Sequence, residues 1–143
     1  MNRTGIICAL IASLAWGLVY NLDQRILIKS TPLTMFFVGS IINIILLLPL
    51  YFYSKDNLGN ILSMDRNQFA LLFTSQTLVL IAGLAILYAV KYLGAPIASA
   101  FEISYPLFVA FFYFTVFNGN LNINFWIGSV LIFAGSVVVM RGG

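Results

Sequence analysis

The sequence has no histidine, a single cysteine and few charged residues. Because Cys8 is the only cysteine, an internal disulfide is excluded, and without histidine a zinc site of the usual nitrogen and sulfur type is excluded as well. Charged residues make up 8% of the chain, whereas an ordinary soluble domain has roughly 25%. The basic residues form no cluster of the kind that binds nucleic acid. Such a thin set of reactive side chains argues against an enzyme, and we expect no metal and no cofactor.

Hydrophobic residues, in contrast, make up 62% of the 143 residues, more than the core of a soluble protein this small could bury. We therefore predict an all-α integral membrane protein, since in lipid a helix satisfies its own backbone hydrogen bonds. Windows without charge, each near the ~20 residues that cross ~30 Å of hydrocarbon, place five transmembrane helices in a single domain, 1–143. The expected helices cover about residues 4–29, 32–54, 67–91, 95–117 and 123–141.

Glu102 is the only acidic or basic residue among the 49 that separate Lys91 from Arg141. A carboxylate in hydrocarbon costs at least about 2.5 kcal/mol, and such residues usually face a cavity or a partner. Glu102 is therefore the first candidate for ligand binding or proton transfer. The structural alternative is that Glu102 is protonated, or is neutralised by Lys91 or a hydroxyl, and only holds the helices together. Pro106 has no N–H for the carbonyl of Glu102, so we expect it to bend this helix.

Four other residues are candidates for the same substrate or proton site. Ser99 and Tyr105 lie three positions from Glu102, which places them on its face if the helix is continuous. Trp16 either stacks on a substrate or serves as a packing or interfacial residue. Tyr88, near the end of the third expected helix, has the same two interpretations.

Four segments carry a family resemblance: Ala15–Gly17, Leu87–Pro96, Tyr105–Phe108 and Trp126–Val138. Together they resemble the drug/metabolite transporter superfamily, specifically its EamA-like domain. The resemblance covers nearly the whole chain, and the order and spacing of the segments agree. Many members have a glutamate in the turn after the fourth helix, where this chain has Asn120. The resemblance assigns no role to Glu102. Its selection as a candidate site residue therefore depends on the physical argument alone.

The resemblance implies a transporter of small metabolites or drugs. Its members commonly have ten helices in two inverted halves of five, so this chain is similar to one half. A complete pathway then needs a second half, from an antiparallel homodimer or another five-helix chain. Proton coupling is expected at Glu102. Two alternatives stay open: a non-transporting accessory or scaffold subunit, and a translocator of lipid-linked sugars. We expect a multi-pass protein of the plasma (inner) membrane of a prokaryote.

Orientation in the membrane follows the distribution of lysine and arginine between its two sides. Arg3, Lys55 and Arg66 lie on the side of the N-terminus, whose amine adds a fourth positive charge. The opposite side carries Arg25, Lys29, Lys91 and Arg141. The balance predicts that the chain inserts in both orientations, which would supply the two inverted halves.

Overall fold

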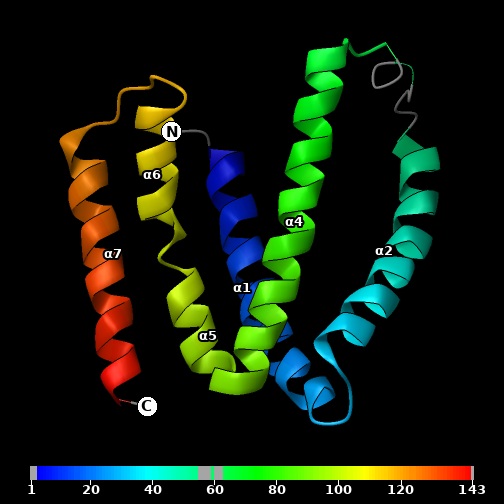
Figure 1. Cartoon of the computed structure of the whole chain (residues 1–143), viewed down its shortest axis with the longest axis horizontal. Helices are drawn as coiled ribbons and strands as arrows, with labels where there is room; N and C mark the ends of the chain where they lie inside the picture. The colour runs from blue at the N-terminus through cyan, green and yellow to red at the C-terminus, as the bar shows by residue number, and fades with distance from the viewer. Residues whose placement is uncertain (1–2, 55–58, 60–62, 143) are drawn as a thin grey trace. The chain divides into compact units, whose positions relative to one another are not determined.

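The computed structural model describes residues 3–54, 59 and 63–142, and within these ranges the regular structure is helical (Figure 1). Five segments are long and apolar enough to cross a membrane, with α5 and α6 together forming the fourth. The all-α membrane fold that the composition predicts is thus confirmed. The helices are α1 (Arg3–Leu27), α2 (Pro32–Ser54), α4 (Arg66–Leu93), α5 (Ala95–Glu102), α6 (Tyr105–Thr115) and α7 (Ile123–Gly142).

Two of the helices, α2 and α4, begin where the side chain of the preceding residue satisfies one of their first N–H groups. Before α2, the hydroxyl of Thr31 accepts the N–H of Thr34 at 3.2 Å, and Pro32 occupies the first helical position. Before α4, the carboxylate of Asp65 accepts the N–H of Gln68 at 2.7 Å, while the Gln68 side chain accepts the N–H of Asp65 at 3.3 Å. This reciprocal capping fixes the start of α4 at Arg66.

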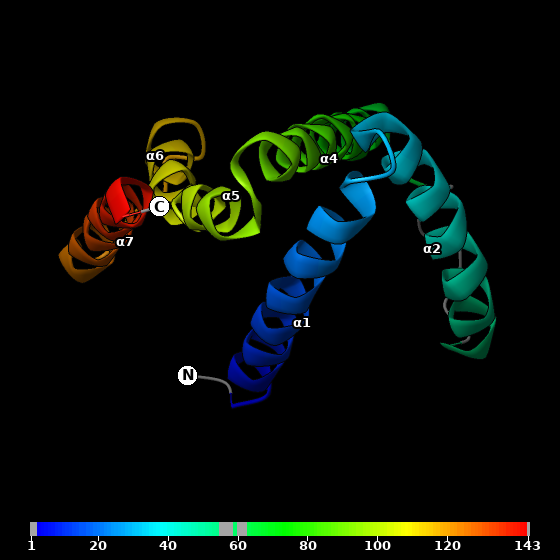
Figure 2. The same cartoon turned by 90° about the horizontal axis from the view of Figure 1, so that it is seen from below.

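The expected helix 95–117 is not continuous, and this expectation needs correction. Its helical part ends at Thr115, and it is divided at Ile103 and Ser104 into α5 and α6. Because Pro106 has no N–H, the carbonyl of Glu102 lacks its usual donor. The N–H of Ser104 turns to the carbonyl of Phe101 at 3.1 Å, and the N–H of Leu107 turns to the carbonyl of Ser104 at 3.2 Å. Figures 1 and 2 show the ribbon leaving its helical path between α5 and α6.

Proline alone does not explain the break, because Pro49 lies inside α2 without interrupting it. What distinguishes the break is a polar contact with α7. The hydroxyl of Ser104 donates to the hydroxyl of Ser136 at 2.9 Å, and Ser136 donates to the carbonyl of Phe133 at 2.7 Å. Both serines are buried. The Ser104–Ser136 contact therefore anchors the non-helical turn to its neighbour.

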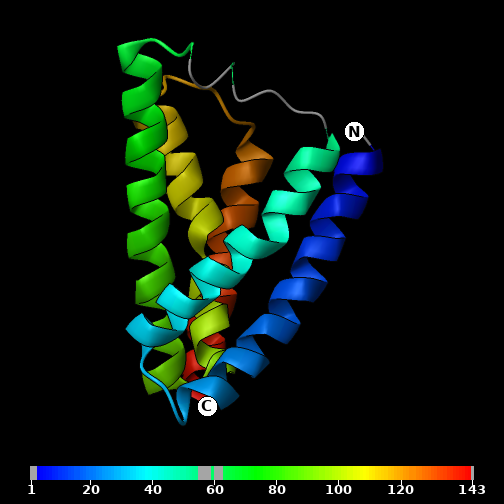
Figure 3. The ribbon, with the colours of Figure 1, turned by 90° about the vertical axis from the view of Figure 1, so that its right-hand side faces the viewer.

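The chain divides into two compact units, which are described separately. The first comprises the described parts of Met1–Arg25 and Ala89–Gly143. In it, α5 and α6 both pack on α7, and α6 lies beside α7 in Figures 1 and 3. Small side chains line this packing: Ala98 and Ala110 are fully buried, and Ser129 is nearly so. Small residues let helix backbones approach closely where no hydrophobic effect drives them together.

The second unit, Ile26–Tyr88, contains all of α2 and most of α4. Here Gly83 of α4 faces the ring of Phe36 of α2, and a Cβ atom added at Gly83 would overlap that ring. The absence of a side chain at Gly83 thus makes room for an aromatic ring from the neighbouring helix.

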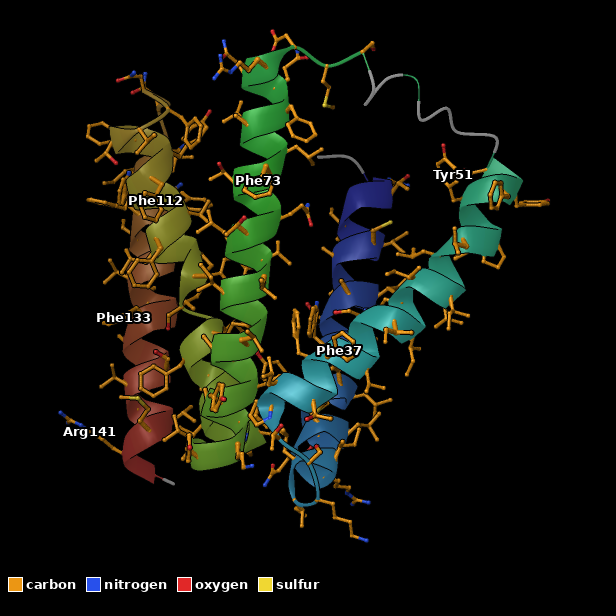
Figure 4. All side chains as sticks on the ribbon, turned by 45° about the vertical axis from the view of Figure 1, so that its right-hand side comes forward. Phe37, Tyr51, Phe73, Phe112, Phe133 and Arg141 are labelled. Carbon is orange, nitrogen blue, oxygen red and sulfur yellow. The ribbon has the colours of Figure 1, made fainter. Side chains whose placement is uncertain are left out.

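Most large apolar side chains are exposed on the surface of the protein, as a lipid environment requires. Phe73 of α4 is 67% exposed and Phe112 of α6 is 52% exposed, and Figure 4 shows both among many outward-facing side chains. Arg141 lies in the last turn of α7, where its charge can reach the membrane surface (Figure 4).

We predict that Gly83→Leu lowers stability, because the new side chain must displace the ring of Phe36. Inserting a larger side chain at a packed position typically costs about 1–3 kcal/mol. The matched control is Gly39→Leu in α2, where an added Cβ meets nothing within 4 Å. Both changes give a similar gain in helix propensity. Thermal unfolding in detergent should show a lower midpoint for Gly83→Leu alone, with partial recovery on adding Phe36→Ala. Equal midpoints for the two leucine variants would contradict this packing.

Candidate functional site

Glu102 is the last residue of α5, directly before the break. Its carboxylate oxygen Oε2 accepts a hydrogen bond from the hydroxyl of Tyr20, which lies 82 residues earlier in α1. Tyr20 is buried, with 7% of its surface exposed, whereas Glu102 is exposed. The carboxylate is therefore held on one side by a fixed donor and is open on another.

Tyr20 belongs to a row of side chains spaced four residues apart on α1, and residues at this spacing share a helix face. Trp16 lies one turn before Tyr20, and the two ring centroids are 6.4 Å apart at an interplanar angle of 54°. Gln24 lies one turn after Tyr20, and its side-chain oxygen accepts the N–H of Ala95 at 2.9 Å. One face of α1 thus contacts both the first and the last residue of α5.

The surroundings of Glu102 are rich in hydrogen-bond acceptors. Three carbonyls at the break, those of Ala100, Glu102 and Ile103, have lost the donor four residues on. For Glu102 that donor is absent because residue 106 is proline, and for the other two it is directed to a different carbonyl. The C-terminal end of a helix is also the negative end of its dipole. The arrangement thus favours a proton, or a ligand that donates hydrogen bonds.

The structure brings only some of the predicted site residues together. Trp16 lies next to the Tyr20–Glu102 pair, and its ring is 58% exposed. Ser99 lies one turn before Glu102, but its hydroxyl donates to the carbonyl of Pro96 in the same helix at 3.0 Å.

Two other candidates belong to other helices than Glu102. Tyr105 begins α6 on the far side of the break, so the shared face expected from a continuous helix does not extend to it. Tyr88 lies on α4, in the second unit. Pro106 is the second residue of α6, and the break lies directly before that helix.

Sequence reasoning missed Tyr20, the residue that contacts Glu102. Tyr20 sits in an apolar run, where a tyrosine resembles any other aromatic residue. A signal was nevertheless present: Trp16, Tyr20 and Gln24 lie four residues apart and place three side chains with polar atoms on one face of the helix.

Comparison with known proteins agrees with the membrane fold. The sequence model of the EamA-like transporter family matches residues 3–141, almost the whole chain. No curated protein and no solved structure matches the chain. The family match indicates a multi-pass membrane transporter of small molecules, with no enzymatic activity characteristic of the family. On the strength of this match, the chain belongs to the EamA-like transporter family.

Proposed function

We propose that this protein transports a small organic solute, a metabolite or a drug, across the plasma (inner) membrane of a prokaryote, and that Glu102 binds the substrate or a coupling proton. The observation that carries the proposal is an exposed carboxylate within a membrane-spanning segment, held by Tyr20 at a break in the helix. Carbonyls released from helical hydrogen bonding are a recurrent feature of transporter binding sites.

The exposure of Glu102 favours a functional role over a structural one. A carboxylate that only joined two helices would be most stable when it is buried and hydrogen-bonded through both oxygens. Within the described residues, however, Oε2 is the oxygen that is engaged, and the residue as a whole is exposed. Since direct contact with lipid is costly, the exposed side of Glu102 must face water, a ligand or another protein surface.

Trp16 is the second element of the proposed site. The ring of Trp16 packs against the ring of Tyr20 and is more than half exposed. One part of its aromatic surface therefore remains available near the Tyr20–Glu102 pair. Such a surface can stack on a flat or apolar part of a solute, while Glu102 engages a polar part. Small-molecule sites typically combine an apolar wall with a few polar groups in this manner.

The proposal includes a second five-helix unit. Two such halves in inverted orientation make up the ten-helix proteins that this chain resembles, and five crossings provide one half. The nearly even distribution of lysine and arginine allows insertion in both orientations. An antiparallel homodimer would supply both halves from one gene product.

We predict that Glu102→Gln abolishes transport, because the amide has a similar shape but cannot carry the charge or exchange a proton. Ligands are first identified by thermal shift on the purified protein, since binding stabilises the folded state. Exchange of a labelled ligand is then measured in proteoliposomes at several pH values. Exchange by Glu102→Gln should fall to the level of empty liposomes.

The control for this experiment is Asp65→Asn, the same chemical change at an acid that caps α4 outside the span. Asparagine is also a good capping residue, so this variant should fold and transport normally. Wild-type exchange with an unchanged pH profile in Glu102→Gln would refute the assigned role of Glu102.

We predict that the C-terminus is found on both sides of the membrane. Fusions of the C-terminus to alkaline phosphatase and to green fluorescent protein report the two locations separately, and both should be active. The double variant Asn67→Lys and Asn120→Lys adds two positive charges on the N-terminal side and should fix that side in the cytoplasm. The fluorescent signal should then be lost, and phosphatase activity should rise. A one-sided signal from the unaltered chain would exclude the antiparallel homodimer and favour a separate partner chain.

A further inference from the structure

The two contacts that join α1 to α5 differ in their response to charge. At the first residue of α5, Gln24 accepts the N–H of Ala95 at 2.9 Å, and both groups are neutral. At the last residue, the hydroxyl of Tyr20 donates to the carboxylate of Glu102. A hydrogen bond to an ionised acceptor is roughly twice as strong as one between neutral groups. Adding a proton to Glu102 therefore weakens the second contact and leaves the first unchanged.

The ends of α5 are built in different ways. Gly94, directly before α5, has a φ of 82°, a backbone conformation that favours glycine. After α5, Ser104 is anchored to Ser136 of α7 at 2.9 Å. The C-terminal end of α5 is thus tied to α7, so the segment of α1 that carries Tyr20 is the partner left free to move when the contact weakens. Gln24 is the point about which that movement would take place.

From this asymmetry we propose that Tyr20 is a positioning residue: it holds the charged Glu102 against α1, and the Trp16–Tyr20 face of α1 separates from α5 when Glu102 takes a proton or a ligand. The proposal rests on the proposed function of Glu102 as the substrate or proton site. In this proposal Tyr20, which contacts Glu102 from another helix, couples the change at Glu102 to the movement of α1. Movement of Trp16 with Tyr20 would then change the aromatic wall of the site.

Other charged and titratable groups near this contact are few. On α1, Asp23 is half-buried and lies one turn after Tyr20, and Arg25 follows it. On α7, the one charged residue within the described range is Arg141, in the last turn. The remaining charged or titratable groups of the first unit on elements next to α5 are Arg3 and Cys8 on α1, Lys91 and Tyr92 at the end of α4, and Tyr105 and Tyr113 on α6.

The fluorescence of Trp16 can test the movement directly. The protein has two tryptophans, and Trp126→Phe removes the other while keeping an aromatic ring beside Phe114. In this background the emission of Trp16 should change with pH, with no ligand other than the proton. The change should be lost in Glu102→Gln and in Tyr20→Phe. It should persist in Tyr113→Phe, which removes a tyrosine hydroxyl on α6. A pH-dependent change of wild-type size in Tyr20→Phe would overturn the proposal.

A second variant protects the test against a folding defect in Tyr20→Phe. Glu102→Asp keeps the charge but withdraws the carboxylate by one methylene, so it should also lose the emission change. In proteoliposomes, Tyr20→Phe should reduce the maximal exchange rate about tenfold to a hundredfold, the factor for losing a hydrogen bond to a charged group, and should flatten the pH profile.

The two proposals fail in different ways. If Tyr20→Phe exchanges ligand with the wild-type rate and pH profile while Glu102→Gln is inactive, the role of Tyr20 is refuted and the proposed function stands. If Glu102→Gln itself is fully active, the proposed function is refuted.

Discussion

A lipid bilayer offers the polypeptide backbone no hydrogen-bond partner, and this constraint governs the whole chain. Each span must be helical unless the protein itself compensates for a lost bond. The fourth span departs from the rule at Ile103 and Ser104, where Pro106 withholds an N–H and Ser136 receives the hydroxyl of Ser104. Pro49 in α2 has no effect of this size, since α2 continues through it. The missing donor and the polar anchor together therefore produce the break.

The break determines what Glu102 can do. In a continuous helix the residue would present a side chain only, whereas at the end of α5 it lies among carbonyls that have lost their usual donors. The same position brings it to Tyr20 of α1. Small residues on α5, α6 and α7 let these helices pack closely enough for the anchor between the two serines to form. The break in the backbone, the close packing of α5, α6 and α7 and the environment of Glu102 thus depend on one another.

Sequence reasoning identified the features that are encoded locally. Windows with almost no charged residues located the spans, and the missing N–H of Pro106 marked the place where the fourth span departs from a regular helix. It anticipated a bend at Pro106 but expected the helix to continue through it. The partner of Glu102 could not be predicted in this way, because Tyr20 lies 82 residues away and its contact depends on how α1 packs against α5. A contact between residues far apart in the chain is harder to recognise in a single sequence than a helix cap or an apolar run.

A carboxylate that serves transport has to be stable in two environments, one with a proton or ligand and one without. Full burial would stabilise only the neutral form, and full exposure to lipid would destabilise the charged form. The contact with Tyr20 offers an intermediate solution: one oxygen of the charged carboxylate has a hydrogen-bond donor, and the other side of the residue remains accessible. Because that donor comes from a different helix, a change in the charge of Glu102 becomes a change in the force between α1 and α5. The second contact of α1, through Gln24, is indifferent to charge and preserves the register of the two helices. In the proposed mechanism, the different character of these two hydrogen bonds on one helix face would convert the binding of a proton into a directed movement.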